Sequence, residues 1–275
     1  MCAMQQSAPI WSPDIVRHYA RIGELSGQTS GLAPGHVQAN LVILPLDWAV
    51  EFFAFCHANP LPCPLVAVGE PGSPALPGLG ADIDIRYDVP RYRVFRDGVA
   101  VGEQSDIADL WRGDFVSFLI GCSFSFEGVL QRDGIRVRHV DMGVNVPMYV
   151  TNIDTVPAGR FSGRLVVSMR PLPPGEVARA IDITGRLPQV HGAPIHCGDP
   201  GKIGIGDLGR PDFGDPVTVE PGEVPVFWAC GVTPQMALAN ARPPIAITHS
   251  PGCMLVTDIP DSDLLSGRFQ PRIGL

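Results

Sequence analysis

The spacing of apolar residues along the chain predicts short strands that alternate with helices. Ile15, Tyr19 and Ile22 recur at the spacing of one helix face, directly after a Ser-Pro pair that suits a helix start. Residues 115–121 are almost wholly apolar, as in a strand that is buried on both faces. Helices are predicted over 13–25, 46–57, 123–133, 174–185 and 233–242. Strands are predicted over 41–44, 63–68, 115–121, 135–140, 147–152, 164–169, 217–219, 225–229, 245–248 and 254–257, and a hairpin over 84–101 turns at Asp97-Gly98.

This alternation predicts the α/β fold class, with a mixed sheet in the main domain. Residues 131–204 follow a different order, with three strands, a helix and a further strand. We expect them to form a smaller α+β domain, inserted into a main domain that comprises 1–130 and 205–275. The length of 275 residues fits one or two domains.

Composition and charge narrow the class of protein. Hydrophobic residues make up 45% of the chain, enough for a sizeable core. The 28 acidic residues outnumber the 20 basic ones, and the net charge of −8 disfavours nucleic acid as a partner. No apolar run reaches the length of a membrane span and no signal peptide is visible, so we expect a cytoplasmic protein without membrane contact. Assembly with further copies of the chain is left open.

A strand, a cysteine and a helix follow one another twice. Cys230 lies between a predicted strand and a helix that starts at Thr233. Cys122 lies between another strand and a helix that starts at Ser123 and carries Glu127. We expect both thiols at the same edge of one sheet, facing one cavity where the ligands of open α/β sheets collect. The alternative is that both are buried free cysteines, which pack as small hydrophobic side chains.

The position of Cys230 before a helix start adds a prediction about its thiol. The partial positive charge at a helix N-terminus favours a thiolate, so the pKa of Cys230 should lie below the free value of about 8.5. Cys230 should then be the thiol most readily alkylated near neutral pH. The seven cysteines are widely spaced and lack a CxxC pair, which predicts neither a disulfide framework nor a cysteine-based zinc site.

Histidines and arginines supply the remaining candidate chemistry. His139, His196 and His249 are candidate acid–base groups, with hydrogen-bonded turn residues as the alternative. The spacing from His191 through His196 to Asp199 matches no strong zinc signature, so no metal is expected.

Two arginines share one face of the predicted hairpin. Arg91 and Arg93 are two residues apart, and a pair of guanidinium groups on one strand face suits a carboxylate ligand. The alternative is an ordinary solvated hairpin edge.

Several long strings of the sequence resemble those of one bacterial family. They lie at residues 29–35, 38–41, 88–93, 118–127, 138–139, 145–149, 158–163, 166–171, 191–196, 211–215, 223–234 and 247–249. Together they are similar to the D-glutamate cyclase family of hydro-lyases over about residues 14–260. One position departs from that pattern, because Cys253 stands where many relatives are expected to carry His.

The resemblance implies dehydration of D-glutamate to 5-oxo-D-proline, without a metal or an organic cofactor. Lactam closure needs a base for an ammonium proton and an acid for the oxygen that leaves as water. The candidates for these roles are Cys122, Cys230, His139, His196 and His249, with Glu127 and Asp199 to orient them. The candidates for substrate binding are Arg91, Arg93 and Arg170 as a carboxylate clamp, and the helix starts at Ser123 and Thr233.

Two other functions remain open for this sequence. A racemase or epimerase without a cofactor could use Cys122 and Cys230 as two bases on opposite faces of an α-carbon. A non-catalytic protein could bind a small acidic metabolite without converting it. In every case the expected ligand is a small acidic molecule.

Overall fold

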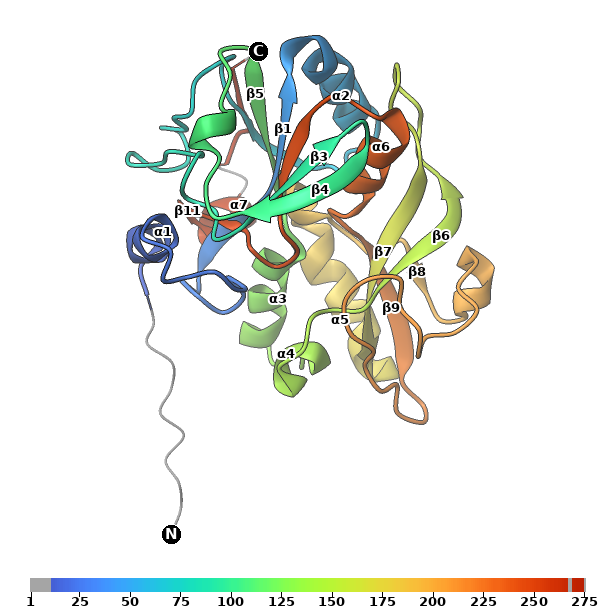
Figure 1. The fold of residues 1–275 in the computed structure, drawn as a ribbon. Coiled ribbons are helices and arrows are strands. Elements are labelled where there is room, and N and C mark those ends of the chain that lie inside the picture. Colours follow the sequence, from blue (N-terminus) through green and yellow to red (C-terminus); the bar gives the residue numbers. More distant parts are fainter. Residues whose placement is uncertain (1–10, 267–268, 275) are drawn as a thin grey trace.

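The larger of two β-sheets forms the centre of the molecule. The computed structural model describes residues 11–266 and 269–274. The strand order of this sheet is β12 (Arg272–Ile273), β2 (Leu65–Val68), β5 (Phe115–Gly121), β1 (His36–Pro45), β10 (Ala246–His249), β3 (Tyr92–Arg96) and β4 (Val99–Gln104), and β11 (Leu255–Pro260) also pairs with β1. The pair β12–β2 is parallel and the other pairs are antiparallel, so the sheet is mixed. The prediction of an α/β fold with a mixed sheet is confirmed (Figure 1).

A second, antiparallel sheet stands beside the first (Figure 1). Its order is β6 (Met148–Asp154), β7 (Arg164–Leu172), β9 (Val224–Ala229) and β8 (His196–Cys197). The predicted inserted domain, 131–204, contains β6, β7 and β8 but not β9. The second sheet therefore extends beyond the predicted boundary, because β9 pairs with β7 over six residue positions.

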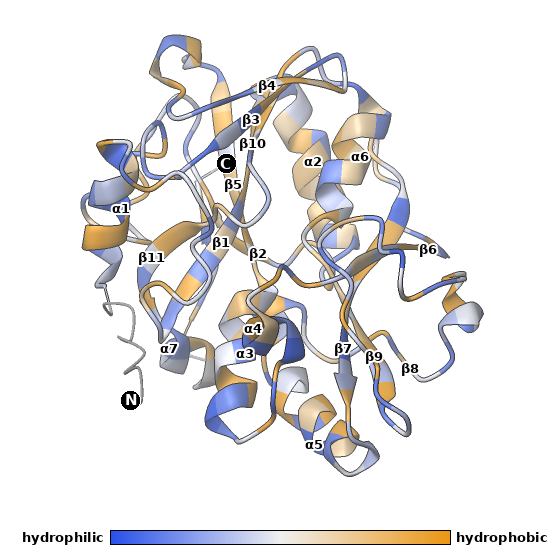
Figure 2. Cartoon of the chain, turned by 60° about the horizontal axis from the view of Figure 1, so that its bottom comes forward, coloured by the Kyte–Doolittle hydropathy of each residue, from blue (hydrophilic) through white to orange (hydrophobic). Residues whose placement is uncertain are grey.

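Helices pack against both faces of the larger sheet and one face of the smaller sheet, whose other face is covered by residues 203–219. They are α1 (Pro13–Arg21), α2 (Leu46–Ala58), α3 (Ser123–Arg132), α4 (Arg138–Met142), α5 (Pro174–Gly185), α6 (Thr233–Ala241) and α7 (Asp261–Leu265). Leu41 and Ile43 on one face of β1 join a core with β9 and α3, whereas Val42 on the other face joins a core with α2 and α6. In Figure 2, α2 and α6 lie on one side of the molecule and α3 and α5 on another. Strand β1 is therefore buried on both faces.

Two predicted strands are absent from the described part of the chain, and the hairpin predicted over 84–101 is confirmed only from Tyr92 onward, because residues 84–91 form turns and no strand. Residues 138–142 form α4 instead of continuing a strand, and Gly143 ends this helix with a positive φ of 66°. Residues 217–219 are irregular, because Val217 alone of the three is buried and no strand pairs with them. The hairpin of β3 and β4 turns at Asp97 and Gly98, whose φ values of 50° and 79° suit a tight two-residue turn.

Candidate active site

The two strand–Cys–helix units meet at one small cavity. Cys122 follows β5 of the larger sheet and precedes α3, and Cys230 follows β9 of the smaller sheet and precedes α6. Both line a cavity of about 50 Å³, which we call the thiol cavity. The prediction that the two thiols share a cavity is confirmed. The prediction that they share one sheet edge is wrong, because each sheet supplies one of the two strands.

The other walls of the thiol cavity come from the ends of several strands. Its remaining lining residues are Asn40, Ser123, Phe124, Asn145, Val146, Met148, His191, Gly231, Val232, Gln235, His249, Pro251, Gly252 and Met254. Asn40 is anchored, since its Nδ2 donates to the Gly121 carbonyl at 2.8 Å. A Cβ at Gly231 would lie 2.5 Å from this Nδ2, so glycine lets the start of α6 approach β1 closely. The two sheets are thereby held together at the cavity.

Two buried histidines in the cavity wall are held neutral. Burial lowers the pKa of His249 to about 4, and burial likewise lowers the pKa of His191 to about 4. His249 Nδ1 accepts from the backbone N–H of Leu41 at 3.1 Å and lies farther, at 3.4 Å, from the Leu41 carbonyl, so the shorter contact assigns the proton of the neutral ring to Nε2. His191 Nδ1 lies 2.8 Å from the Leu61 carbonyl, which can only accept, so this ring is protonated on Nδ1 and Nε2 keeps a lone pair. The two rings therefore offer one donor and one acceptor.

Both cavity thiols are held protonated. Burial raises the pKa of Cys122 to about 12 and the pKa of Cys230 to about 11. The Cys230 thiol donates to Met148 Sδ at 3.4 Å, in an otherwise apolar cluster. The predicted low pKa of Cys230 is therefore wrong. The start of α6 favours the thiolate, as expected, but loss of hydration at a fully buried sulfur outweighs it.

A buried ion pair supports the Cys122 side of the cavity. Arg170 Nε donates to Glu127 Oε1 at 3.1 Å, Nη2 donates to the same oxygen, and Nη1 donates to Ser168 Oγ at 2.7 Å. Arg170 Nη2 also donates to Ser123 Oγ at 3.0 Å. Burial alone would raise the pKa of Glu127, but Arg170 and His139 outweigh it and hold the pKa at about 2. Glu127 is therefore a carboxylate at any physiological pH.

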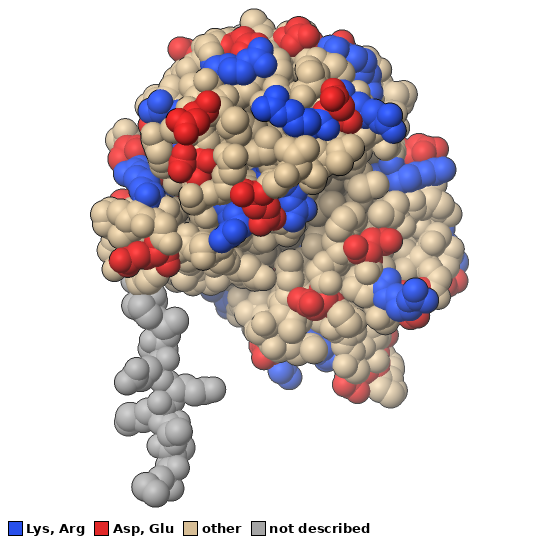
Figure 3. Space-filling model, in the orientation of Figure 1, with Lys and Arg blue, Asp and Glu red and all other residues tan. Residues whose placement is uncertain are grey.

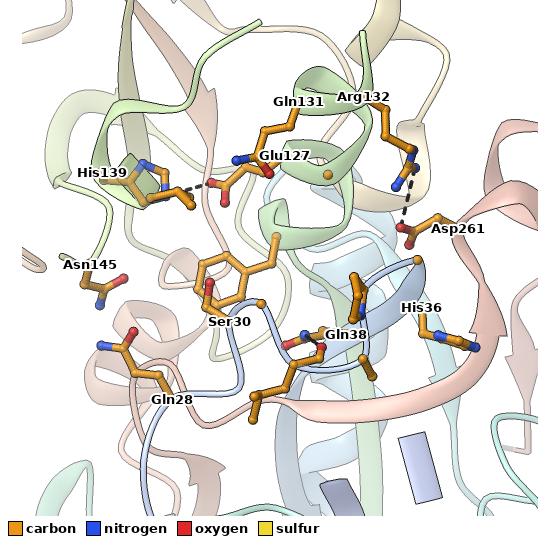
Figure 4. A pocket seen from close by; sticks show the side chains of 18 of the residues that line it. Gln28, Ser30, His36, Gln38, Glu127, Gln131, Arg132, His139, Asn145 and Asp261 are labelled. Carbon is orange, nitrogen blue, oxygen red and sulfur yellow. Dashed lines mark hydrogen bonds and ion pairs between the residues drawn. The ribbon is translucent and has the colours of Figure 1, made fainter. Parts of the chain in front are cut away.

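A larger hollow of about 360 Å³ adjoins the thiol cavity, because Phe124 and Asn145 line both. We call it the amide groove, after the side chains of Gln28, Gln38, Gln131 and Asn145 that line it (Figure 4). Glu127 and His139 lie in its wall, with His139 Nε2 3.3 Å from Glu127 Oε1. The two hollows are thus a small one lined by thiols and histidines and a larger one lined by amide side chains.

Several predicted site residues lie elsewhere or are fully occupied. Arg170 is 1% exposed, and its guanidinium group donates hydrogen bonds to Glu127 and Ser168 within the protein. Arg93 pairs with Glu103 across the hairpin at 2.9 Å, and Arg91 Nη1 lies 4.0 Å from the same carboxylate, so neither lines the cavity. The carboxylate clamp stays a prediction without support from this placement.

Two further predicted residues also have other partners. His196 stacks on Phe227 in the second sheet, and its Nε2 lies 2.7 Å from the Asp199 carbonyl, outside the cavity. Thr233 Oγ1 accepts from the backbone N–H of Val166 at 3.0 Å, which ties the start of α6 to β7. The acid–base role of His196 and the ligand-binding role of Thr233 stay predictions.

The sequence reasoning missed two residues of the thiol cavity, Asn40 and His191. Asn40 carried a sequence signal, because it is a polar residue directly before the apolar run 41–44. His191 was considered only for a metal site, and no local signal places it at the cavity, since its positive φ of 80° is known only from the structure. Within the described residues no group of three His, Cys, Asp or Glu side chains is arranged to hold a metal ion.

On the face drawn in Figure 3, acidic and basic side chains are interspersed, without a large field of one sign. Many charged side chains of the described chain are paired, such as Arg93 with Glu103 and Arg160 with Glu51. In the part of the chain that the structure describes, no helix is long and apolar enough to cross a membrane.

Fold and site together define an α/β protein whose two sheets enclose a cavity lined by acid–base side chains, the arrangement of an enzyme. A family model described as D-glutamate cyclase matches residues 116–258. The chain therefore belongs to the D-glutamate cyclase family, and it is an enzyme of the lyase class, a hydro-lyase.

Relatives from several bacteria match almost the whole chain. A protein of Bordetella petrii is 63% identical over 88% of this chain and 92% of its own length. Proteins of Verminephrobacter eiseniae and a Jannaschia species are 61% and 60% identical, over 90% and 89% of this chain and 90% and 92% of their own lengths. All three carry the name "Putative hydro-lyase". A solved nitrogen repressor-like protein of Methanococcus jannaschii aligns over 86% of this chain and 92% of its own with a TM-score of 0.38 at 10% identity, which is too low to bear on function.

Proposed function

We propose that this hydro-lyase dehydrates D-glutamate to 5-oxo-D-proline, with the thiol cavity as the reaction site. The observation that carries the proposal is the set of neutral acid–base groups on one small cavity: His191, His249, Cys122 and Cys230. Membership of the D-glutamate cyclase family supports the substrate.

The reacting γ-carboxylate can be received by the starts of two helices. Helix α3 has ten residues and α6 has nine, and the residues at the start of each line the thiol cavity. The free backbone N–H groups and the dipole of a helix start stabilise an anion. A cavity of about 50 Å³ holds roughly one or two water-sized groups, so the reacting γ-carboxylate fits there and the rest of the molecule extends past Asn145 into the amide groove.

The proton transfers follow from the protonation states. The neutral His191 Nε2 takes one proton from the α-ammonium group, and the freed amine attacks the γ-carboxyl carbon to form the C–N bond. His249 Nε2–H and a cavity thiol hydrogen-bond to the carboxyl oxygens and stabilise the negative charge that develops on them. The proton taken by His191 and the second proton, lost by the nitrogen after the C–N bond forms, both pass to the oxygen that leaves. One C–O bond then breaks, that oxygen leaves as water, and His191 returns to its neutral form.

Proton NMR of the purified protein with D-glutamate in D₂O tests this function. We expect the lactam signals of 5-oxo-D-proline to grow while the α-proton is retained, because cyclisation breaks no C–H bond. L-glutamate serves as the stereochemical control. Binding of D-glutamate with neither lactam formation nor exchange would overturn D-glutamate as the substrate of this hydro-lyase.

A second candidate function, two-base racemisation, is favoured by one observation. Cys122 and Cys230 come from different sheets and face a single cavity, as two bases on opposite faces of an α-carbon would require. The raised pKa values of both thiols weigh against it, because one of them would have to be a thiolate at rest. Deuterium incorporation at the α-carbon without lactam formation would establish it.

A further inference from the structure

The amide groove ends at a buried carboxylate that has one oxygen without a partner. The side chain of Asp261, at the start of α7, is 6% exposed, and its Oδ1 makes no hydrogen bond within the described part of the chain. Its ion-pair partner is Arg132, whose Nη2 lies 3.7 Å from Oδ2, beyond hydrogen-bond distance. Arg132 is 51% exposed, so water screens much of this attraction.

A buried carboxylate oxygen without a donor is costly, because it has lost water and gained nothing in return. His36 is the other titratable group beside it, and it too has a ring nitrogen, Nδ1, without a partner. Figure 4 places Asp261, His36 and Arg132 together at one end of the groove, with His139 and Asn145 toward the other. The far end therefore has two buried polar atoms that no described residue satisfies, and a donor from outside the chain would reach Asp261 Oδ1 after a rotation of the carboxylate toward the groove.

The charge of Asp261 selects among donors. A cationic N–H donor forms a shorter and stronger bond to a carboxylate than a neutral one does. Between this end and the thiol cavity, Gln131 and Asn145 present amide groups to the groove. A hollow of about 360 Å³ is also larger than a glutamate side chain needs, and it lies in the range of pockets that hold extended ligands.

We propose that the amide groove is a second subsite, in which Asp261 binds an ammonium group carried by an extension of the substrate. The inference rests on the proposed function and specifies its substrate class: a D-glutamyl unit whose α-carboxyl is joined through an amide to a chain that ends in an ammonium group. Such a compound still loses water on closure, because the amine attacks the free γ-carboxyl group and the α-amide is untouched. The product is the corresponding amide of 5-oxo-D-proline.

Calorimetric binding of matched product amides tests the subsite without turnover. The first probe is an amide of 5-oxo-D-proline with an alkyl chain that ends in an ammonium group, made in a series of chain lengths. The matched second probe has the same chain but ends in a methyl group. We expect the ammonium probe of the best length to bind the wild-type protein about tenfold more tightly than its methyl partner. The variant Asp261→Asn, which keeps the shape and removes the charge, should bring this ratio close to one.

Two variants control for general damage. Asp263→Asn removes a charge from the same helix at a residue that does not line the groove, and it should keep the wild-type ratio. Asp261→Glu keeps the negative charge and should retain part of the affinity ratio between the ammonium and methyl probes. Equal binding of the two probes to the wild type, no binding of either, or a ratio that survives in Asp261→Asn would overturn the subsite. A preference that depends on Asp261, in a protein that forms no lactam from D-glutamate, would overturn the proposed function and leave the subsite standing.

Discussion

The two strand–Cys–helix units share a backbone plan but differ in what surrounds the sulfur. Beneath Cys122 lies a network of buried charge, in which Arg170 holds both Glu127 and Ser123. Around Cys230 the surroundings are apolar, with Met148 in contact with the thiol. Both thiols are nevertheless held protonated, since burial raises both pKa values above the ordinary range.

The comparison shows that the position of each sulfur and its protonation state have different causes. The strand and the helix start fix where each sulfur lies, and they do so alike in both sheets. The protonation state is decided by burial, which outweighs the helix start in both units. Because Cys122 lies over a charged network and Cys230 lies in apolar packing, we expect substitutions in the two units to lower the stability of the protein by different amounts.

The largest expected effect comes from removing either thiol. If both units contribute to the reaction, Cys122→Ala and Cys230→Ala should each lower kcat for D-glutamate about 10²–10⁴-fold, the usual contribution of a general acid or base. Steady-state kinetics measure this, with Cys56→Ala, a buried thiol outside the cavity, as the control. If only one cavity variant loses turnover, the two units are not functional partners.

The next effect concerns the stability of the Cys122 unit. Glu127→Gln leaves the Arg170 guanidinium buried without a carboxylate, and we expect a loss of about 3–5 kcal/mol in the free energy of unfolding. Denaturant titration measures this loss. The control, Glu103→Gln, breaks the exposed pair with Arg93 and should cost less than about 1 kcal/mol. Similar losses of unfolding free energy in the two variants would mean that the buried network stabilises the Cys122 unit no more than an exposed ion pair does.

Acid should weaken the wall that both units share. The pKa values of His191 and His249 are lowered from 6.5 to about 4 in the folded protein, so the unfolded chain binds more protons between these values. Stability is therefore full above pH 6.5 and falls as the pH drops toward 4, by about 1–2 kcal/mol per histidine at pH 5. Unfolding by urea at pH 7 and pH 5 measures it. The variant His249→Gln should reduce this loss, and an unchanged loss would contradict the assignment.

The smallest expected effect concerns the start of α6 in the Cys230 unit. Thr233→Val leaves the buried N–H of Val166 without its acceptor, and we expect a loss of about 1–2 kcal/mol in the free energy of unfolding. Thermal unfolding measures it against Thr233→Ser, which keeps the hydroxyl. A loss as large as that of Glu127→Gln would show that the hydrogen bond of Thr233 stabilises the Cys230 unit as strongly as the buried ion pair stabilises the Cys122 unit.

Local signals in the sequence identified most of the fold. The long apolar run of β5, the helix starts at Ser123 and Thr233, and the turn at Asp97-Gly98 each depend on neighbouring residues, and each is present. The strand predicted over 135–140 is wrong because Ile135 and Val137 reach the main core from an irregular segment that leads into α4, which gives the same apolar spacing as a strand.

The candidate site was less accessible to sequence reasoning, because it depends on contacts between distant segments. Nothing local shows that β5 and β9 belong to different sheets, or that His191 lines the same cavity as Asn40 and the two thiols. The lowered pKa expected for Cys230 was wrong for the same reason. The helix start is visible in the sequence, whereas the burial that outweighs it depends on residues such as Met148 and Val166.

The central claim is that the small cavity where the two sheets meet receives the reacting molecule. NMR of the imidazole resonances during titration with 5-oxo-D-proline tests it most directly. We expect the resonances of His191 and His249 to shift with one common saturation curve, while those of His196, which lies outside the cavity, stay in place. Saturable shifts at His196 with none at His191 and His249 would contradict the account.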